Sequence, residues 1–514
     1  MRVLLVYPEF PNTYWGFQYG LPLAGKRSNL PPLGLITVAA MLPADWELRL
    51  IDLNIEPLPD DLLNWADVVL TGGMRVQIPS TDWILRRAAE LGKRTVVGGP
   101  AVSTDPTLFA QADVRVIGEV EGVIDEVVTA IRIGARGTTV TATDFPVVQT
   151  SPVPRFDLLD LSAYGSVSIQ YSRGCPFACE FCDIIQLFGR VPRVKSADQI
   201  LAELNSLYAL GHRGSLFFVD DNFIGNQKAV KELLPAVTTW QRERGYPYNF
   251  ATEASINLAS RSELLSGMVQ AGFNSVFVGI ETPSLEALKG AGKTQNLSLG
   301  ADEAVRRISA AGLEVMGGFI VGFDSDTPEI FEAQRALILG SPVPLAMLGL
   351  LMALPKTALW DRLEREGRLR VEGSGDHGDQ FGRPNFEPAM DEKALLSGYA
   401  TLLATLYSRD AYYDRIEAFV RMCGPLPGGG RRPRVSDLAT LARLVTYIGV
   451  ASPQRWRFWR LVATTLRHRP ERFAWAMSRV IIGEHMIRYT AEDVLPRLRL
   501  AEQMVSAQEV RLIA

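Results

Sequence analysis

The residues in this chain with the clearest chemical potential are three cysteines within eight positions, in the order Cys175-Pro-Phe-Ala-Cys179-Glu-Phe-Cys182. Thiolates at such short spacing are typical of iron–sulfur and zinc sites, which normally use four protein ligands. The fourth cysteine, Cys423, lies far downstream, and the nearest histidine, His212, is thirty residues away. A cluster held by three thiolates keeps one iron open to another ligand. The spacing therefore favours a catalytic iron–sulfur site over structural zinc or merely buried cysteines.

The spacing C-x3-C-x2-C, with Phe181 directly before the last cysteine, resembles the cluster motif of the radical S-adenosylmethionine (SAM) superfamily. The resemblance implies that Cys175, Cys179 and Cys182 hold a [4Fe-4S] cluster, and that the amino and carboxylate groups of SAM chelate its open iron. One electron from the cluster would then cleave SAM to methionine and a 5′-deoxyadenosyl radical, which removes hydrogen from a substrate carbon. An electron donor such as a flavodoxin or a ferredoxin is expected.

The chain as a whole has the size and composition of a multi-domain enzyme. Its 514 residues are too many for one core, and a hydrophobic share of 47% is ample for packed interiors. Four cysteines are too few for a disulfide scaffold, which predicts a reducing, cytoplasmic location. The N-terminus has the pattern of a strand, and no run reaches the ~20 apolar residues of a spanning helix. The net charge of −4 gives no reason to expect nucleic acid as a partner.

Residues 1–145 predict an open parallel α/β sheet of the flavodoxin or Rossmann type. Short apolar runs recur, each followed by a turn and a helical stretch, as in strands covered on both faces. The runs are 3–7, 48–53, 68–71, 95–97 and 114–117. Ligands bind such sheets at the carboxyl ends of the strands, where glycine allows close approach to the backbone. The residues at those ends are Thr71, Gly72, Gly98, Gly99, Gly118 and Glu119. Glycine is equally common in ordinary turns, so a purely structural role stays open.

The position of this sheet, directly before the cysteine motif, resembles the cobalamin-binding domain of many radical SAM methylases. The resemblance implies that the six strand-end residues bind cobalamin. The chain departs from one family pattern, because residues 1–145 contain no histidine and the D-x-H-x-x-G motif is therefore absent. Cobalamin bound here would take no lower axial imidazole from this domain. A domain that has lost the cofactor is the alternative.

Residues 155–385 predict a partial (β/α)6 barrel, which would place its chemistry at the carboxyl ends of the strands. Six strand-like runs are separated by helical stretches. They are 167–171, 215–219, 249–252, 275–279, 315–321 and 346–351. By resemblance, the ends of these strands hold SAM. Asp221 and Asn222 would bind its amino group, and Glu253 and Ser255 would bind its ribose. Ile320, Gly322 and Leu354 would line its adenine. Each acidic residue could equally be a helix cap or lie in a solvated loop.

Residues 386–514 predict a mainly helical and basic region. From Ala411 onward there are 17 arginines, no lysine and nine acidic residues, a net charge of +8, so the rest of the chain carries −12. Aromatic and cationic residues alternate over 455–460, and helical numbering places Trp459 and Leu466 on a different face from Arg460 and Arg467. Such a helix could rest on the inner face of a membrane or pack on the barrel with a solvated basic face. Nucleic-acid binding is a weaker third option, because no recognised reading module accompanies the charge.

The whole chain resembles a family of cobalamin-domain radical SAM proteins that have a distinctive C-terminal extension and include the hopanoid C-2 methylases. The stretches that carry this resemblance are 31–34, 168–172, 218–226, 281–283 and 353–357. It implies a C-methyltransferase that passes a methyl group through methylcobalamin to an unactivated carbon of a small molecule or lipid, such as a hopanoid. A cobalamin-independent radical enzyme for coupling, cyclisation or rearrangement is the alternative. Sulfur insertion would need a second cysteine triad near the N-terminus, which is absent, and a redox sensor would not cleave SAM.

Overall fold

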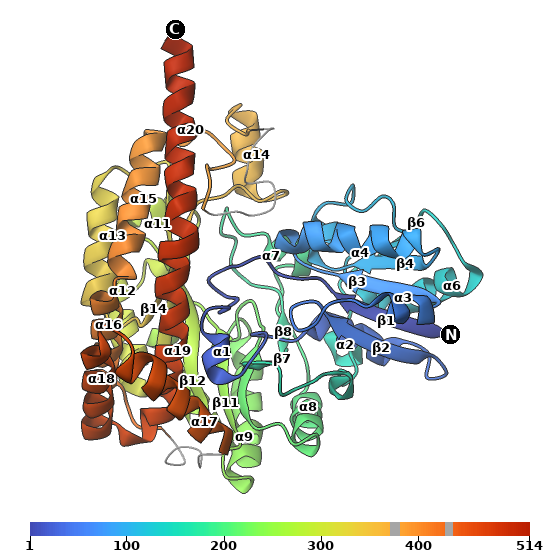
Figure 1. Cartoon of the computed structure of the whole chain (residues 1–514), viewed down its shortest axis with the longest axis horizontal. Helices are drawn as coiled ribbons and strands as arrows, with labels where there is room; N and C mark the ends of the chain where they lie inside the picture. The colour runs from blue at the N-terminus through green and yellow to red at the C-terminus, as the bar shows by residue number, and fades with distance from the viewer. Residues whose placement is uncertain (371–380, 427–434, 514) are drawn as a thin grey trace. The chain divides into compact units, whose positions relative to one another are not determined.

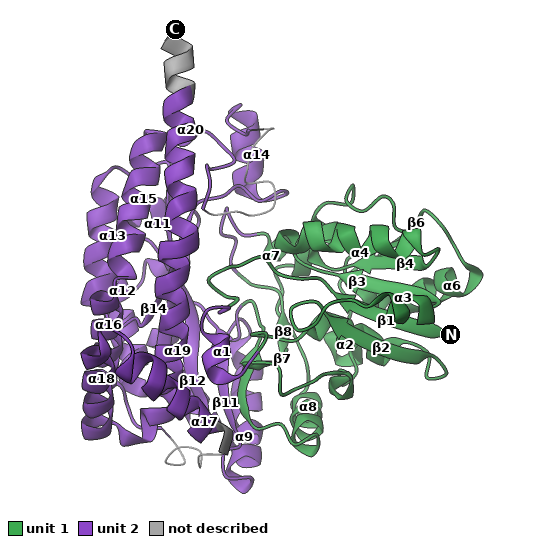
Figure 2. Ribbon diagram, viewed as in Figure 1, with its two compact units in different colours: residues 1–16, 27–176, 183–221 green, residues 17–26, 177–182, 222–514 purple. Residues whose placement is uncertain are grey.

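The computed structural model describes residues 1–370, 381–426 and 435–513 (Figure 1). The chain divides into two compact units, coloured separately in Figure 2. Unit 1 comprises residues 1–16, 27–176 and 183–221, and unit 2 comprises residues 17–26, 177–182 and 222–514. The predicted fold class is confirmed, because two parallel sheets are followed along the chain by a helical C-terminal region.

Unit 1 contains a parallel sheet of six strands in the order β2-β1-β3-β4-β5-β6. The strands are β1 Arg2–Tyr7, β2 Glu47–Asp52, β3 Val68–Gly72, β4 Arg94–Gly98, β5 Val114–Ile117 and β6 Thr138–Thr141. The helices packed on them are α2 Leu33–Met41, α3 Asp60–Trp65, α4 Ile78–Glu90, α5 Pro100–Thr104 and α6 Ile124–Ile133. All five predicted strands are present, and the additional strand β6 is a short run of threonines around one valine.

Alternate residues of β1 enter different cores, which explains its unbroken apolar sequence. Leu4 and Val6 pack with α3 and α4, whereas Leu5 packs with α2. All three are fully buried, and burying a side chain of this size contributes roughly 1.5–3 kcal/mol. Helices therefore cover both faces of the sheet, as the apolar runs predicted.

The strand order reverses at β1, which has β2 on one side and β3 on the other. In open α/β sheets, ligand sites lie at the carboxyl ends of the strands beside such a reversal. Gln77 fixes this end of the sheet, because its buried Nε2 donates to the carbonyl oxygen of Pro8 at 2.6 Å and its Oε1 accepts from the Met74 N–H at 2.9 Å. The loop after β3 is thus tied to the loop after β1.

A second parallel sheet has the strand order β14-β13-β12-β11-β10-β7. The strands are β7 Val167–Ile169, β10 Gly214–Phe218, β11 Tyr248–Glu253, β12 Phe273–Glu281, β13 Glu314–Val321 and β14 Leu345–Leu350. The helices along this part of the chain are α7 Ile184–Phe188, α8 Ala197–Ala209, α9 Gln227–Glu243, α10 Ser262–Ala271, α11 Leu285–Gly290, α12 Ala301–Ala311, α13 Glu329–Gly340 and α14 Ala358–Arg365. All six predicted strands are present, in sequential order. A short antiparallel pair, β8 Ser172–Arg173 with β9 Arg193–Val194, lies outside the prediction.

The C-terminal region of unit 2 is helical, as predicted. Its helices are α15 Glu392–Leu406, α16 Arg409–Met422, α17 Val435–Leu444, α18 Arg455–His468, α19 Phe473–Tyr489 and α20 Leu495–Ile513, the long red helix of Figure 1. A π-helical turn, Val445–Val450, follows α17. Helix α18 packs against α16 and α19. Among the described residues, no helix has the length and apolarity that membrane spanning requires.

A buried polar cluster joins β13 to α19. Glu314, at the start of β13, is fully buried, and its carboxylate accepts hydrogen bonds from Arg479 Nε at 2.7 Å and from Trp475 Nε1 at 2.8 Å. Tyr412 of α16 donates its hydroxyl to the carbonyl oxygen of Arg479 at 2.8 Å. A charge in this position is stable only while its partners remain. The barrel sheet and the C-terminal helices of unit 2 are therefore joined by specific polar contacts.

Candidate active site

The three motif cysteines lie on the loop after β8. All three are partly exposed and none forms a disulfide, whereas Cys423 is buried. In unit 1 the Cys175 N–H donates to the carbonyl of Gly189 at 3.2 Å, and in unit 2 the Cys182 N–H donates to that of Cys179 at 3.2 Å. Over the described residues, no three His, Cys, Asp or Glu side chains gather around one ion position. A cubane binds each thiolate through a different iron, and three accessible thiols on one loop have the donor chemistry that it needs.

A cation that sequence analysis missed lies near two of these thiols. Lys293 forms an ion pair with Glu281 at 2.5 Å, and its Nζ lies 5.8 Å from the ring centre of Phe181. Burial lowers the pKa of Lys293, but the negative charges of Glu281, Cys179 and Cys182 outweigh burial and raise the pKa above its usual value. Lys293 is therefore held in its charged form beside the motif.

The ion pair is held in a tight backbone setting. Glu281, the last residue of β12, has a positive φ of 65°, which few non-glycine residues adopt. A Cβ at Gly279 would lie 2.7 Å from Lys293 Nζ, so only glycine leaves room for the pair there. Gln334 holds the strand end, since its Nε2 donates to the carbonyl oxygens of Glu281 at 2.8 Å and of Ile320 at 3.1 Å.

The turn after Lys293 brings two buried amides to the same place. Gln295 Nε2 lies 3.7 Å from Cys179 Sγ, and Asn296 Nδ2 donates to the carbonyl oxygens of Gly279 and Ile280 at 3.0 Å. In the described part of the chain, the side-chain oxygens of both amides have no hydrogen-bond partner. A buried polar atom without a partner costs about 1–3 kcal/mol. Such oxygens suit a ligand that carries N–H or O–H donors, as the ammonium, hydroxyls and adenine of SAM do.

Two of the residues predicted to bind SAM are in contact with each other. Asn222 Oδ1 accepts from the Ser255 N–H at 3.2 Å, and Asn222 Nδ2 donates to Ser255 Oγ at 3.2 Å. Glu253 ends β11, and its carbonyl oxygen accepts from the Phe223 N–H at 2.9 Å. A polar group is thus assembled at the carboxyl end of β11. Its contact with the ribose and amino group of SAM stays a prediction.

The glycine after β13 has a structural role of its own. Gly322 has a φ of +102°, and its N–H donates to Asp326 Oδ2 at 2.9 Å. A Cβ at Gly322 would contact Leu351 and Leu395 at 3.6–3.8 Å, so this glycine lies against packed apolar side chains. Burial raises the pKa of Asp326 to about 6. Ile320 packs in the adjoining core and Leu354 is partly exposed. The adenine contacts of Ile320, Gly322 and Leu354 stay predictions.

Two carboxylates follow β10 in unit 1, and Asp220 is buried whereas Asp221 is partly exposed. Asp220 Oδ1 accepts from the backbone N–H groups of Tyr171, at 2.9 Å, and Ser172, and Asp221 Oδ2 accepts from the Gly174 N–H at 3.0 Å. Burial raises the pKa of Asp220 to about 7 and that of Asp221 to about 6, although these N–H groups oppose it. Both carboxylates therefore anchor the backbone that leads into the cysteine motif. The predicted contact of Asp221 with the amino group of SAM stays open.

We expect Asp220→Asn to stabilise the protein at pH 8 by about 2–4 kcal/mol and to leave its stability at pH 4 unchanged. Because the pKa of Asp220 is raised in the folded state, the unfolded chain releases this proton first as the pH rises from about 4 to about 7. The wild type therefore loses stability over that pH range. The Asp220→Asn variant does not, because asparagine cannot ionise. Denaturant unfolding at both pH values measures the difference. The exposed Asp198→Asn variant is the control. An equal stability difference between Asp220→Asn and the wild type at pH 4 and pH 8 would contradict the raised pKa of Asp220.

Four of the six residues predicted to bind cobalamin, Thr71, Gly72, Gly98 and Gly99, lie at the carboxyl ends of β3 and β4. A Cβ on Gly72 would lie 2.6 Å from the carbonyl oxygen of Gly98, and one on Gly99 would lie 3.2 Å from the nitrogen of Gly73. These glycines therefore let two loops approach at backbone distance, which is the structural role left open above. Thr71 is buried, and in the described part of the chain its hydroxyl has no hydrogen-bond partner. A hydroxyl of this kind can both donate to and accept from a polar ligand.

The loop after β5 adds a charged cluster to unit 1. Gly118 has a φ of +86°, and the adjacent Glu119 forms ion pairs with both Arg173 and Arg193 at 2.5 Å. Arg173 also pairs with Glu121 at 2.7 Å. The carboxylate of Glu119 is thus bound by two guanidinium groups that flank the cysteine motif in sequence. Contact of Gly118 and Glu119 with cobalamin stays a prediction.

The parts of the chain match three family models. Residues 24–128 match the B12 binding domain, residues 169–337 match the radical SAM superfamily, and residues 357–495 match a domain of unknown function, DUF4070. The fold and the site together define a radical SAM enzyme with an N-terminal B12-binding domain. The cofactors of this class are a [4Fe-4S] cluster, SAM and cobalamin, as predicted.

Full-length relatives identify the family. The chain is 40% identical to an uncharacterized methyltransferase of Synechocystis, over 98% of this chain and 94% of the relative. It is 35% identical to the hopanoid C-2 methylase of Rhodopseudomonas palustris, over 96% of this chain and 94% of the relative. The chain therefore belongs to the family of B12-binding radical SAM methyltransferases that includes this methylase, and the predicted enzyme class is confirmed.

Two solved structures have the same fold. The cobalamin-dependent SAM radical enzyme OxsB, solved with aqua-cobalamin and SAM, has a TM-score of 0.60 at 15% identity, over 98% of this chain and 83% of that chain. The radical SAM methyltransferase TsrM of Kitasatospora setae, solved with cobalamin and a [4Fe-4S] cluster, has a TM-score of 0.58 at 17% identity, over 78% of this chain and 90% of that chain.

Proposed function

We propose that this protein methylates an unactivated carbon of a lipid of the hopanoid class. The observation that carries the substrate class is the identity of 35% to a hopanoid C-2 methylase over nearly the full length of both chains. When bound, the cluster and SAM supply a hydrogen-abstracting radical, and cobalamin supplies the methyl group. The protein contributes the binding, orientation and exclusion of water that such chemistry requires.

Three sets of residues divide this work in the proposal. Cys175, Cys179 and Cys182 hold the cluster, and Lys293 places a positive charge beside two of those thiolates. The unpaired oxygens of Gln295 and Asn296, with the group formed by Asn222 and Ser255, accept hydrogen bonds from SAM. At the end of β3, Thr71 offers its hydroxyl to cobalamin, while Gly72, Gly98 and Gly99 let the loops after β3 and β4 pack closely beside it.

We also propose that the protein works in the cytoplasm at the inner surface of a membrane, and that a flavodoxin or a ferredoxin is its electron donor. Polycyclic lipids partition into bilayers, so an enzyme that acts on them gains from contact with the bilayer surface. The high positive charge of the C-terminal region is in keeping with that location.

The test is an anaerobic assay with reconstituted protein, reductant, SAM and a hopanoid extract, in the presence and absence of cobalamin. We expect 5′-deoxyadenosine and a methylated lipid, the second only with cobalamin. An absorption spectrum of the purified protein reports cobalamin binding independently of turnover. Production of 5′-deoxyadenosine and an unmethylated rearranged product without cobalamin would overturn the proposal in favour of a cobalamin-independent radical enzyme.

A further inference from the structure

The surface around α18 exposes large apolar side chains that no other described part of the chain covers. Trp456, Trp459 and Leu466 of α18 are 51%, 46% and 52% exposed, and Tyr447 and Val450 of the preceding π-helical turn are 63% and 61% exposed. We call these five residues the aromatic patch. Soluble proteins seldom gather exposed apolar side chains of this size on one surface without a binding partner.

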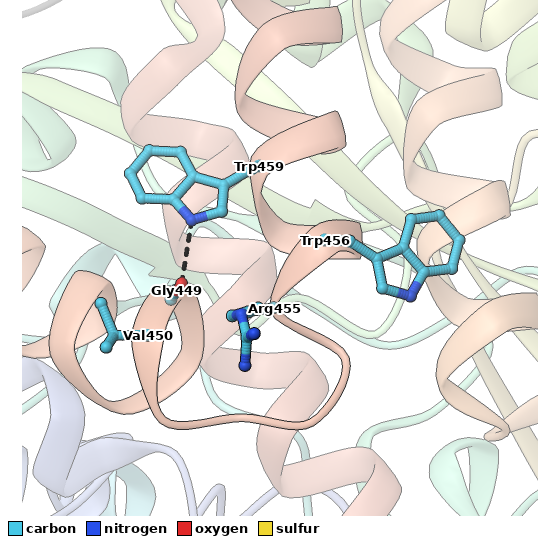
Figure 3. Close-up of a pocket in the computed structure, with 5 residues that line it drawn as sticks. All are labelled: Gly449, Val450, Arg455, Trp456 and Trp459. Carbon is cyan, nitrogen blue, oxygen red and sulfur yellow. Dashed lines mark hydrogen bonds between the residues drawn. The ribbon is translucent and has the colours of Figure 1, made fainter.

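The patch is continuous from the turn to the helix. Trp459 Nε1 donates to the carbonyl oxygen of Gly449 at 2.9 Å, which places the indole beside Val450. An open hollow of about 750 Å³ is lined by Gly449, Val450, Arg455, Trp456 and Trp459, as Figure 3 shows. The indoles therefore flank an apolar hollow that opens to the surface.

The exposed face of α18 mixes apolar and cationic residues, in contrast to the separate faces that helical numbering predicts. The helix buries Phe458, Leu461 and Thr465. The opposite face of the helix is exposed, and its residues are Trp456, Trp459, Arg460, Ala463, Leu466 and Arg467. An amphipathic helix with aromatic anchors among arginines is typical of proteins that lie in the interface of a bilayer.

The charge of this segment fits an anionic partner. Residues 438–470 contain six arginines and no acidic residue. The acidic residues of α16 that pack near α18 are already paired. Arg457 binds Asp410 at 2.7 Å and Asp414 at 2.6 Å, and Arg460 binds Glu417 at 3.1 Å. Within the described residues, Arg455 and Arg467 form no ion pair, so their charges remain available at the edge of the patch.

We propose that the aromatic patch, with Arg455 and Arg467, docks unit 2 on the surface of a bilayer that contains anionic lipids. The indoles and Leu466 enter the interface, and the two arginines contact the headgroups. The inference deepens the proposed function, because it names the surface that would bring the enzyme to a bilayer-borne substrate. It does not need the methylation to occur, so each can fail without the other.

The test is cosedimentation of the full-length protein with vesicles of phosphatidylcholine, with and without phosphatidylglycerol. We expect binding to the anionic vesicles that weakens as salt is added. Arg455→Gln with Arg467→Gln should lower the partition coefficient about 20- to 30-fold, since each cation contributes roughly fivefold. Trp456→Ser with Leu466→Ser should lower it at least about tenfold. Trp83→Ser with Arg86→Gln, which alters exposed residues of α4, is the matched control and should leave binding unchanged.

Three outcomes would overturn the docking proposal. They are equal vesicle binding by the wild type and both patch variants, self-association through the patch in sedimentation velocity, or retention of a nucleic acid that vesicles do not displace. Methylation of detergent-dispersed lipid separates the two proposals. Patch variants that methylate dispersed lipid normally but lose vesicle binding support the docking surface. Vesicle binding by a wild type that methylates no lipid supports the surface and refutes the proposed substrate.

Discussion

The Cys179→Ala variant is expected to lose its iron–sulfur cluster, and its reductive cleavage of SAM should fall by about 10³-fold or more. Cys179 supplies one of three thiols in the motif, it is accessible, and Gln295 and Lys293 lie around it. With two thiolates remaining, a cubane has too few protein ligands to stay bound. Iron and sulfide content after anaerobic reconstitution, together with the electron paramagnetic resonance spectrum of the reduced protein, measures the loss without relying on turnover.

Cys423→Ala is the matched control for this experiment. Cys423 is also a free cysteine, but it is buried, and its Sγ lies 3.6 Å from the carbonyl oxygen of Val420 at the end of α16. Its removal should cost about 1 kcal/mol of stability through a small cavity and leave the iron content unchanged. Full iron content and normal SAM cleavage in Cys179→Ala would show that the motif does not hold the cluster.

Glu314→Ala is expected to lower the free energy of unfolding of unit 2 by about 3–5 kcal/mol, the largest stability effect that we predict. The substitution removes the only acidic partner that Arg479 has among the described residues and leaves that guanidinium buried, together with the indole N–H of Trp475. Urea denaturation followed by circular dichroism measures the change.

Two further variants test whether the stability loss comes from an unpaired buried charge or merely from the loss of an ion pair. Glu303→Ala breaks an exposed pair with Arg307 on α12 and should cost about 0.5 kcal/mol or less. Glu314→Leu combined with Arg479→Met removes both charges and should recover most of the loss, because apolar pairs often replace buried ion pairs at little cost. A loss in Glu314→Ala no larger than that in Glu303→Ala would contradict the structural role of the cluster.

The strands were predictable because most of them are buried on both faces. A run such as residues 3–6 has no polar position to confuse a strand with a loop, and the structure places it inside the first sheet, between β2 and β3. Strand β6 escaped prediction because only Val140 among its four residues is buried. The pair β8 and β9 has two residues in each strand, which is too short to produce any period.

The candidate site was predictable only where spacing along the chain defines it. The cysteine motif is such a case, because its ligands are neighbours in sequence. Lys293, Gln295 and Asn296 lie more than 110 residues after the motif in a polar turn of ordinary composition, and only folding brings them to β12 and Cys179.

The exposed face of α18 could not be predicted from helical periodicity either. Periodicity groups apolar residues on one face, but it carries no information about which element the helix packs against. Helix α16 offers Asp410 and Asp414, which draw Arg457 onto the packed side and leave the indole of Trp456 outside. The ion pairs between α16 and α18 therefore determine which face of α18 is exposed.

The left-handed backbone at Glu281 restricts how this position can change during evolution. Most side chains at such a φ cost about 1–3 kcal/mol, and glycine alone adopts it freely. Glycine would relieve the strain but would remove the carboxylate that neutralises Lys293. Replacement of Glu281 by glycine would therefore leave the buried ammonium of Lys293 without a counter-charge. Selection can thus keep a glutamate at this position although its backbone conformation is unfavourable.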